Sequence, residues 1–240
     1  MKQTAFEKLP RHLAFIMDGN GRWAQKRLLP REAGHKKGVQ TVQRVVKYCR
    51  ELGIPCLTFF AFSTENWKRP KSEIEALFGI FRDYLEQIPA DYVKENIRLR
   101  VLGEISAFPE DLAAACQRAE AETAGCDGMS LNIALNYGSR AEIARAANLA
   151  AAEGPVTEES LSRHLYTAGL PDPDLLIRTS GEMRLSNFLL FQLAYAELWF
   201  TETPWPAFGK RELHEALEAY GVPPDLVVGD FDSLGRRPSH

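Results

Sequence analysis

The regular alternation of short apolar runs with longer segments of helical periodicity constrains the fold more than any other feature. Runs typical of buried strands lie at 12–17, 57–62, 98–102, 129–135, 175–177 and 197–201. Helical spacing or capping signals mark 34–53, 72–88, 109–123, 140–153, 157–165 and 210–220. Ser72 and Glu75 have the spacing of a capping box at the start of the second of these segments. Strands that alternate with helices predict an α/β fold with a mainly parallel central sheet flanked by helices.

The length and composition fit one large domain. The chain has 240 residues, of which 45% are hydrophobic, and it shows no linker, repeat or low-complexity segment. We therefore expect a single domain over 1–240, with 1–11 as an N-terminal lead and 221–240 as an irregular tail.

The charge and the cysteines exclude several classes of protein. A formal net charge of −3 argues against nucleic acid as a partner. The four cysteines form no C-x-x-C pair, and free thiols indicate a reducing compartment. No signal peptide is visible at the N-terminus, and the longest apolar run, 188–200, is too short to span a bilayer. A cytoplasmic location is therefore expected.

The polar residues that follow the first predicted strand form a candidate ligand site, because ligands of open α/β sheets bind at the carboxyl ends of the strands. Asp18 is followed by a turn with two glycines and by Arg22. Backbone N–H groups and a guanidinium suit phosphate oxygens, and Mg²⁺ usually takes one or two carboxylates plus substrate phosphates. An ordinary Asp-Gly turn is the alternative. The basic residues that follow disfavour it, and they are Lys26, Arg27, Arg31, His35, Lys36 and Lys37.

Two further polar loops follow other predicted strands. The loop 63–70 combines a hydroxyl, an amide, an indole and a guanidinium, and a polar loop anchored by Trp67 is an equal alternative. The loop 178–187 holds Arg178, Arg184 and several hydroxyl groups, and its alternative is a surface loop with solvated arginines. Two anion sites indicate two phosphorylated substrates or one long polyanion, and the negative net charge disfavours the polyanion.

Five sequence blocks together resemble one known family. HLAFIMDGNGRWA, GHKKG, FAFSTENWKRP, LNIALNYGSRAEI and LLIRTSGEMRLSNFLLFQLAYAELWF are similar, in order and spacing, to the signature blocks of the cis-prenyltransferases. The resemblance covers the chain from about His12 to Tyr220. It implies an Mg²⁺-dependent transferase that condenses isopentenyl diphosphate in cis onto an allylic diphosphate, usually farnesyl diphosphate. It implies a long-chain product such as undecaprenyl diphosphate, with a short- or medium-chain product as the alternative.

The resemblance also assigns roles to individual residues. Asp18 matches the aspartate that holds Mg²⁺ on the diphosphate, Glu197 a second carboxylate linked to the metal, and Asn66 a residue proposed to assist proton removal. A diphosphate oxygen or a relayed water is an equal candidate for the proton acceptor. The residues that match the cradle of the allylic diphosphate are Gly19, Asn20, Gly21, Arg22, Arg31 and His35. Those that match the aromatic positions and the loop around both substrates are Trp23, Ser63, Thr64, Glu65, Trp67 and Arg69. Those that match the isopentenyl diphosphate site are Arg178, Arg184, Leu185 and Ser186.

The family fold implies a hydrophobic tunnel between the sheet and two helices. Residues alternate between the two faces of a strand, so one face of a predicted strand should line this tunnel, with ordinary core as the alternative. The two candidate faces are Leu57, Phe59 and Ala61 on one strand and Leu131, Ile133 and Leu135 on another. The resemblance further implies a homodimer, for which 188–200 is a candidate interface segment, and peripheral membrane contact for product release.

The chain departs from the family pattern at two places, and three rival classes fit it less well. The tail after 221 lacks the arginine-rich ending of many bacterial members, and Met183 stands where a polar or basic residue is common. Trans-elongating prenyltransferases carry D-D-x-x-D, which does not occur here. A phosphohydrolase with Asp18 as nucleophile would need D-x-D, but Asn20 stands at the second position. Non-catalytic partner subunits lack the D-G-N-G-R-W block that this chain retains.

Overall fold

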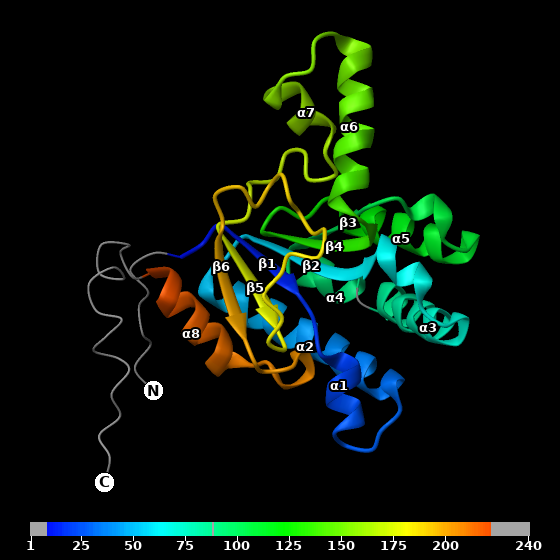
Figure 1. Ribbon diagram of the computed structural model, residues 1–240, viewed down its shortest axis with the longest axis vertical. Coiled ribbons are helices and arrows are strands. Elements are labelled where there is room, and N and C mark those ends of the chain that lie inside the picture. Colours follow the sequence, from blue (N-terminus) through cyan, green and yellow to red (C-terminus); the bar gives the residue numbers. More distant parts are fainter. Residues whose placement is uncertain (1–8, 88, 222–240) are drawn as a thin grey trace.

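Six parallel strands form one sheet at the centre of the computed structural model, which describes residues 9–87 and 89–221 (Figure 1). The strands are β1 (His12–Ile16), β2 (Cys56–Ser63), β3 (Ile97–Leu102), β4 (Met129–Tyr137), β5 (Leu175–Thr179) and β6 (Glu197–Thr201). Their order across the sheet is β3-β4-β2-β1-β5-β6, and every neighbouring pair is parallel. The α/β fold with a mainly parallel sheet is confirmed.

Helices connect the strands, as the alternating pattern predicts. The α-helices are α1 (Asn20–Gln25), α2 (Arg31–Leu52), α3 (Lys71–Gln87), α4 (Pro89–Lys94), α5 (Glu110–Thr123), α6 (Ser139–Glu153), α7 (Glu158–His164) and α8 (Lys210–Gly221). The short 3₁₀ helices are η1 (Thr64–Lys68), η2 (Ile105–Ala107) and η3 (Trp205–Ala207). Helices α1 and α4 have no predicted counterpart, because six residues are too few to show a helical period. The tail after 221 and most of the N-terminal lead lie outside the described residues.

The start of α3 differs from the prediction. The helix begins at Lys71, so Ser72 lies inside its first turn rather than at the cap. The carbonyl oxygen of Pro70 accepts the N–H groups of Glu73 and Ile74 at 2.9 and 3.2 Å. Proline suits the residue before a helix because its φ is fixed and it has no N–H to satisfy, and the predicted cap at Ser72 is therefore wrong.

The main core lies between the sheet and one layer of helices, which includes α2, α3, α5 and α8. Phe15 of β1 and Phe59 of β2 are fully buried there, with stacked rings 4.8 Å apart. A smaller core on the opposite face is covered by the segment after β5, through Phe188, Leu189 and Leu193. Helices α6 and α7 project beyond the sheet at the top of Figure 1. No helix of the described residues is long and apolar enough to cross a membrane.

Strand β1 lies where the order of the sheet reverses, with β2 on one side and β5 on the other. Ligands of open α/β sheets bind beyond the carboxyl ends of the strands at such a point. The three strands end close to Asp18, Ser63 and Ser180. The fold therefore brings all three polar loops of the sequence to one edge of the sheet.

Candidate active site

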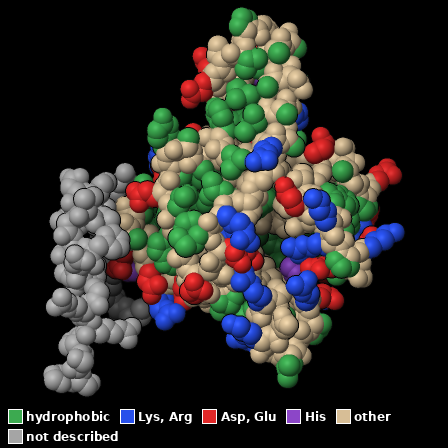
Figure 2. Space-filling model, in the orientation of Figure 1, with side chains coloured by type: hydrophobic (Ala, Val, Ile, Leu, Met, Phe, Trp, Pro, Cys, Tyr) green, Lys and Arg blue, Asp and Glu red, His purple; other side chains and the backbone are tan. Residues whose placement is uncertain are grey.

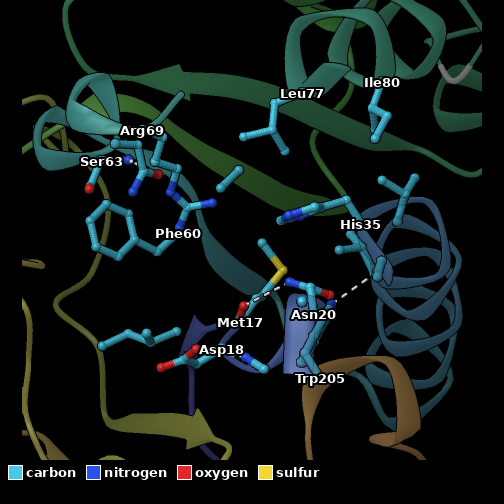
Figure 3. Close-up of a pocket in the computed structure, with 18 of the residues that line it drawn as sticks. Met17, Asp18, Asn20, His35, Phe60, Ser63, Arg69, Leu77, Ile80 and Trp205 are labelled. Carbon is cyan, nitrogen blue, oxygen red and sulfur yellow. Dashed lines mark hydrogen bonds between the residues drawn. The ribbon is translucent and has the colours of Figure 1, made fainter. Parts of the chain in front are cut away.

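A cavity of about 830 Å³ opens at this edge and extends between the sheet and helices α2 and α3. Figure 3 shows its polar floor, with Asp18 and Asn20, and the apolar side chains of Leu77 and Ile80, which project into it from α3. Figure 2 shows Lys and Arg side chains beside acidic ones around the middle of the face in view. One continuous cavity thus has a charged part and an apolar part.

Most residues predicted for the site line this cavity. The predicted residues that line it are Asp18, Gly19, Asn20, Gly21, Arg22, Arg31, His35, Ser63, Glu65, Asn66, Arg69, Arg178 and Ser186. Those outside its lining are Trp23, Thr64, Trp67, Arg184, Leu185 and Glu197. Of the two candidate tunnel faces, Ala61 and Ile133 line the cavity, whereas the other four residues belong to the core.

Asp18 is held rigidly at the end of β1. Its backbone carbonyl accepts the Thr179 hydroxyl at 2.8 Å and the Trp205 N–H at 2.9 Å. Its carboxylate accepts the Gly19 N–H at 2.6 Å and Nη2 of Arg178 at 3.1 Å. Gly19 has φ 93°, and a Cβ there would lie 2.5 Å from the Ser180 hydroxyl oxygen, so this position requires glycine.

Arg178 is a buried cation that faces the same floor. It is only 3% exposed, and it donates to the Ser186 hydroxyl at 2.8 Å and to the backbone carbonyl of Arg184. Within the described residues, two buried polar atoms at the cavity, Nε of Arg178 and Oδ1 of Asn20, have no hydrogen-bond partner. Nε of Arg178 is a donor and can bind an oxygen of an anionic ligand, whereas Oδ1 of Asn20 is an acceptor that lies against Gly38 of α2.

The loop after β5 is strained and tied to the loop after β2. Ser180, Ser186 and Asn187 have φ of 75°, 50° and 62°, a region that costs a non-glycine residue about 1–3 kcal/mol. Asn187 donates through Nδ2 to Glu65 at 3.0 Å and lines the cavity. Strain of this kind clusters at functional sites. Asn187 ends the predicted loop 178–187 but was not among the predicted site residues, because it carries no charge and lies in no periodic pattern.

A charged cluster forms the second polar wall, between α2 and α3. Glu73 accepts Nη1 of Arg31 at 3.1 Å and Nη1 of Arg69 at 2.9 Å, and Nε2 of His35 lies 3.8 Å from it. Burial, reinforced by the nearby Arg69, lowers the pKa of His35 to about 4, so its imidazole is neutral at pH 7. Glu73 was also missed, because on the sequence it reads as an ordinary first-turn acid of a helix.

Two predicted residues of η1 have local structural partners. The Asn66 side-chain oxygen accepts the Ser63 N–H at 3.1 Å. The Trp67 indole donates to Asn136 at 2.8 Å, and its ring packs against Phe62 and other aromatic rings outside the cavity. The structure therefore places Trp67 as an anchor of the loop, which was the alternative reading of this residue.

The structure does not bring Glu197 to Asp18 within this chain. The strand registers pair Glu197 with Leu175 and Leu175 with Leu13, so Glu197 lies at the amino-terminal ends of the strands. Asp18 follows the carboxyl end of β1. Arg184 does not line the cavity either: its side chain is 61% exposed and forms an ion pair with Glu182.

The residues present fit Mg²⁺ held by one carboxylate. The described residues contain no group of three or more His, Cys, Asp or Glu side chains able to hold a metal. Mg²⁺ needs no such cage, because it is usually bound by one or two carboxylates together with substrate phosphates. The two hydrogen bonds to the Asp18 carboxylate leave further acceptor sites on its oxygens.

The fold and the cavity define a class of α/β proteins that bind an anionic group beside an apolar pocket. Residues 16–223 match the family model described as "Putative undecaprenyl diphosphate synthase". The chain belongs to this family, the cis-prenyltransferases, and is a prenyl transferase enzyme.

Similar proteins agree with this assignment. The isoprenyl transferase of Geobacillus kaustophilus is 51% identical over 220 residues, which are 88% of this chain and 86% of the relative. That of Chromobacterium violaceum is 53% identical over 213 residues, 88% of this chain and 85% of the relative. Among solved structures, lavandulyl diphosphate synthase from Lavandula x intermedia in complex with dimethylallyl diphosphate has a TM-score of 0.86 at 36% identity, covering 89% of this chain and 96% of that one. A "probable undecaprenyl diphosphate synthase" from Campylobacter jejuni has a TM-score of 0.76 at 37% identity, covering 89% and 95%.

Proposed function

We propose that this enzyme condenses isopentenyl diphosphate in cis with an allylic primer, farnesyl diphosphate, and repeats the step to a long-chain polyprenyl diphosphate. One observation carries the proposal: a single cavity joins an arginine-rich floor with Asp18 to an apolar pocket under α3. A diphosphate with a hydrocarbon tail has these same two parts. The alternative is a short- or medium-chain product of the same reaction.

The reaction needs fixed positive charge more than it needs a strong base. The bond from the allylic carbon to the diphosphate oxygen breaks, and the diphosphate leaves with the electron pair. The alkene of isopentenyl diphosphate forms the new C–C bond to that carbon and then loses a proton, which gives a longer allylic diphosphate. Arginines aimed at the leaving group lower this barrier, and a cavity that holds both substrates supplies proximity.

We assign the two anion sites to two sets of side chains. The allylic diphosphate takes the glycine-containing turn after Asp18 with Arg22 and Arg31. The isopentenyl diphosphate takes Arg178 and Ser186, and Arg184 joins them only if it leaves Glu182. The proposed proton acceptor is a diphosphate oxygen, because the Asn66 side-chain oxygen already accepts the Ser63 N–H and an amide is a weak base.

Asp18 is the residue that would hold Mg²⁺ in this scheme. When bound, the ion neutralises charge that develops on the departing diphosphate. The chain's own contribution is to fix that carboxylate on a rigid strand end and to keep Arg178 beside it.

The test is incubation of the purified chain with farnesyl diphosphate, labelled isopentenyl diphosphate and Mg²⁺, followed by mass analysis of the products. We expect a ladder of polyprenyl diphosphates whose masses differ by one five-carbon unit. The Asp18→Asn variant should lose at least about a hundredfold in turnover, about 3 kcal/mol, while its circular-dichroism spectrum stays that of the folded wild type. Release of inorganic phosphate without chain growth would instead support the phosphohydrolase, and inactivity of the chain alone the partner subunit.

We also propose that the enzyme is a cytoplasmic homodimer that contacts membranes only peripherally. On the segment 188–200, Tyr195 is 99% exposed and Leu198 of the edge strand β6 is 47% exposed. Large apolar side chains exposed on one segment indicate an interaction surface. Light scattering should give twice the chain mass, and Leu198→Arg should give the single-chain mass.

A further inference from the structure

One face of α3 spans the cavity from its charged end to its apolar end. The residues of α3 that line the cavity have the spacing of one helix face, i, i+4, i+7, i+8 and i+11, and they are Glu73, Leu77, Ile80, Phe81 and Tyr84. Tyr84 lies eleven positions after Glu73, which corresponds to about 16 Å along a helix. Glu73 lies among the arginines, so Tyr84 marks the opposite limit of this wall.

The walls that face this part of α3 are apolar. Val39 and Val42 of α2 and Ile133 of β4 line the cavity together with Leu77 and Ile80. A hydrocarbon chain whose diphosphate is bound near Arg31 therefore has one direction in which to lie, towards Tyr84. Each condensation inserts a unit next to the diphosphate, so the far end of the chain advances towards that residue.

Tyr84 is fixed in place by a second tyrosine. Its hydroxyl lies 2.5 Å from the hydroxyl of Tyr92 on α4, and the two rings meet edge to face with centroids 6.5 Å apart. Tyr92 is only 5% exposed. Burial raises the pKa of Tyr84 to about 12 and that of Tyr92 well above its ordinary value, so both phenols stay protonated. Rotation of the Tyr84 ring would break this partly buried hydrogen bond, which is unfavourable without a replacement partner.

We propose that the Tyr84–Tyr92 pair is the product-length stop of this enzyme. The ring of Tyr84 closes the apolar end of the cavity, and Tyr92 holds it there against the advancing chain. The inference rests on the proposed function and adds the residues that decide where elongation ends. Tyr84 is a specificity-determining residue, and Tyr92 is a positioning residue that acts through it.

The test compares the product ladders of variants at the two tyrosines. Tyr84→Ala removes the ring and should move the main product to a chain longer by at least one five-carbon unit. Tyr84→Phe and Tyr92→Phe keep both rings but remove the hydrogen bond, so they should give a broader ladder with a smaller shift in the same direction. If Tyr84→Ala does not fold, Tyr84→Leu loses less volume and should shift the ladder in the same way.

Leu85→Ala is the matched control on the same helix. Leu85 is buried in the core and does not line the cavity, so this variant should melt at a lower temperature and keep the wild-type ladder. A wild-type ladder from Tyr84→Ala, or an equal shift from Leu85→Ala, overturns the length stop. Wild-type enzyme that makes no polyprenyl product overturns the proposed function instead.

Discussion

Arg31 and Arg184 look alike on the sequence, but their guanidinium groups lie in different surroundings. Both side chains are exposed and each is paired with a glutamate, Arg31 with Glu73 and Arg184 with Glu182, but only Arg31 lines the cavity. We expect Arg31→Ala to raise the KM for the allylic substrate by about tenfold to a hundredfold, the loss of one charge-assisted contact. We expect Arg184→Ala to act on the KM for isopentenyl diphosphate.

Steady-state kinetics with each substrate varied in turn measures this difference. Lys36→Ala is the matched control, because Lys36 pairs with Glu32 and does not line the cavity. Both KM values of that variant should equal those of the wild type. An identical pattern from Arg31→Ala and Arg184→Ala would contradict two separate anion sites.

His12 should make the stability of the fold depend on pH. Its ring is fully buried, with one nitrogen 2.7 Å from the Pro171 carbonyl and the other 2.7 Å from the Thr58 hydroxyl. Burial lowers its pKa from 6.5 to about 4, against smaller opposing effects of Pro171 and Asp174. The unfolded chain therefore binds a proton at higher pH than the folded one. Stability should be complete above about pH 6.5 and should fall as the pH drops towards 4, by about 3 kcal/mol.

Urea denaturation from pH 7 to pH 4 measures this loss. His35, whose pKa is also lowered to about 4, contributes in the same direction. The comparison is therefore between wild type and His12→Asn, in which only the His12 contribution is removed. Equal slopes of unfolding free energy against pH in the two proteins would contradict the effect.

At the scale of single residues, charge and motif predicted the charged residues that line the cavity but not the residues that hold them in position. Asp18, Arg31 and Arg178 follow strands or lie in basic clusters, and all three line the cavity. The site roles of Glu73 and Asn187 were not predicted, because they depend on contacts with residues far along the chain. Arg31 is 42 positions from Glu73, and Glu65 is 122 positions from Asn187. No local pattern records a partner at that distance.

At the scale of elements, the close packing of α1 against α2 depends on glycine. A Cβ at Gly34 would lie 2.1 Å from the backbone oxygen of Asn20. Gly34→Ala should therefore lower the free energy of unfolding by about 1–3 kcal/mol, although alanine is the better helix former by about 1 kcal/mol. Displacement of Asn20 should also weaken the binding of the allylic substrate.

Gly79→Ala on α3 is the matched control for this prediction. A Cβ at Gly79 meets no atom within 4 Å, so this variant should be stabilised by up to about 1 kcal/mol. Chemical denaturation of both variants decides the matter. A higher free energy of unfolding in Gly34→Ala would contradict the prediction, because it would show that α1 can move away from α2 without loss of stability.

The sequence predicted those helices that have a long hydrophobic period or a clear capping residue. The predicted range 34–53 ends where Gly53, with φ 84°, caps α2, and the predicted range 157–165 begins where Thr157 caps α7. The turn after Asp18 was predicted without the helix that follows it, because a six-residue helix has no full pattern of its own. Its position is set by packing against Gly34 and Gly38 of α2.

At the scale of the whole molecule, the size of the cavity should limit the product. Ala61 of β2 lines the cavity and packs at the edge of the main core. Ala61→Leu adds three heavy atoms to that wall, where extra volume costs about 1–3 kcal/mol of strain. We expect shorter products, with the first condensation largely spared. Chromatography of the products together with thermal melts measures this, and an unchanged ladder with a lower melting temperature would assign Ala61 to the core alone.

The sequence predicted that the strands run parallel, but it did not predict their order in the sheet. Alternation predicts parallel strands, but the reversal at β1, which brings the loops after β1, β2 and β5 together, follows from long-range packing. The cavity depends on the same packing, because it reaches Ala61 and Ile133 but not Phe59 and Leu131, which are fully buried in the core.

The presence of Glu73 and Tyr84 on one helix has a consequence for how such enzymes can diverge. Under the proposed function, successive turns of α3 lie about 5.4 Å further from the diphosphate site. The arginines around Glu73 fix the position of that site. A single codon change on the inner face of this helix would reset the length of the lipid while the diphosphate chemistry remains intact. Product length can therefore be inherited and selected separately from catalytic rate.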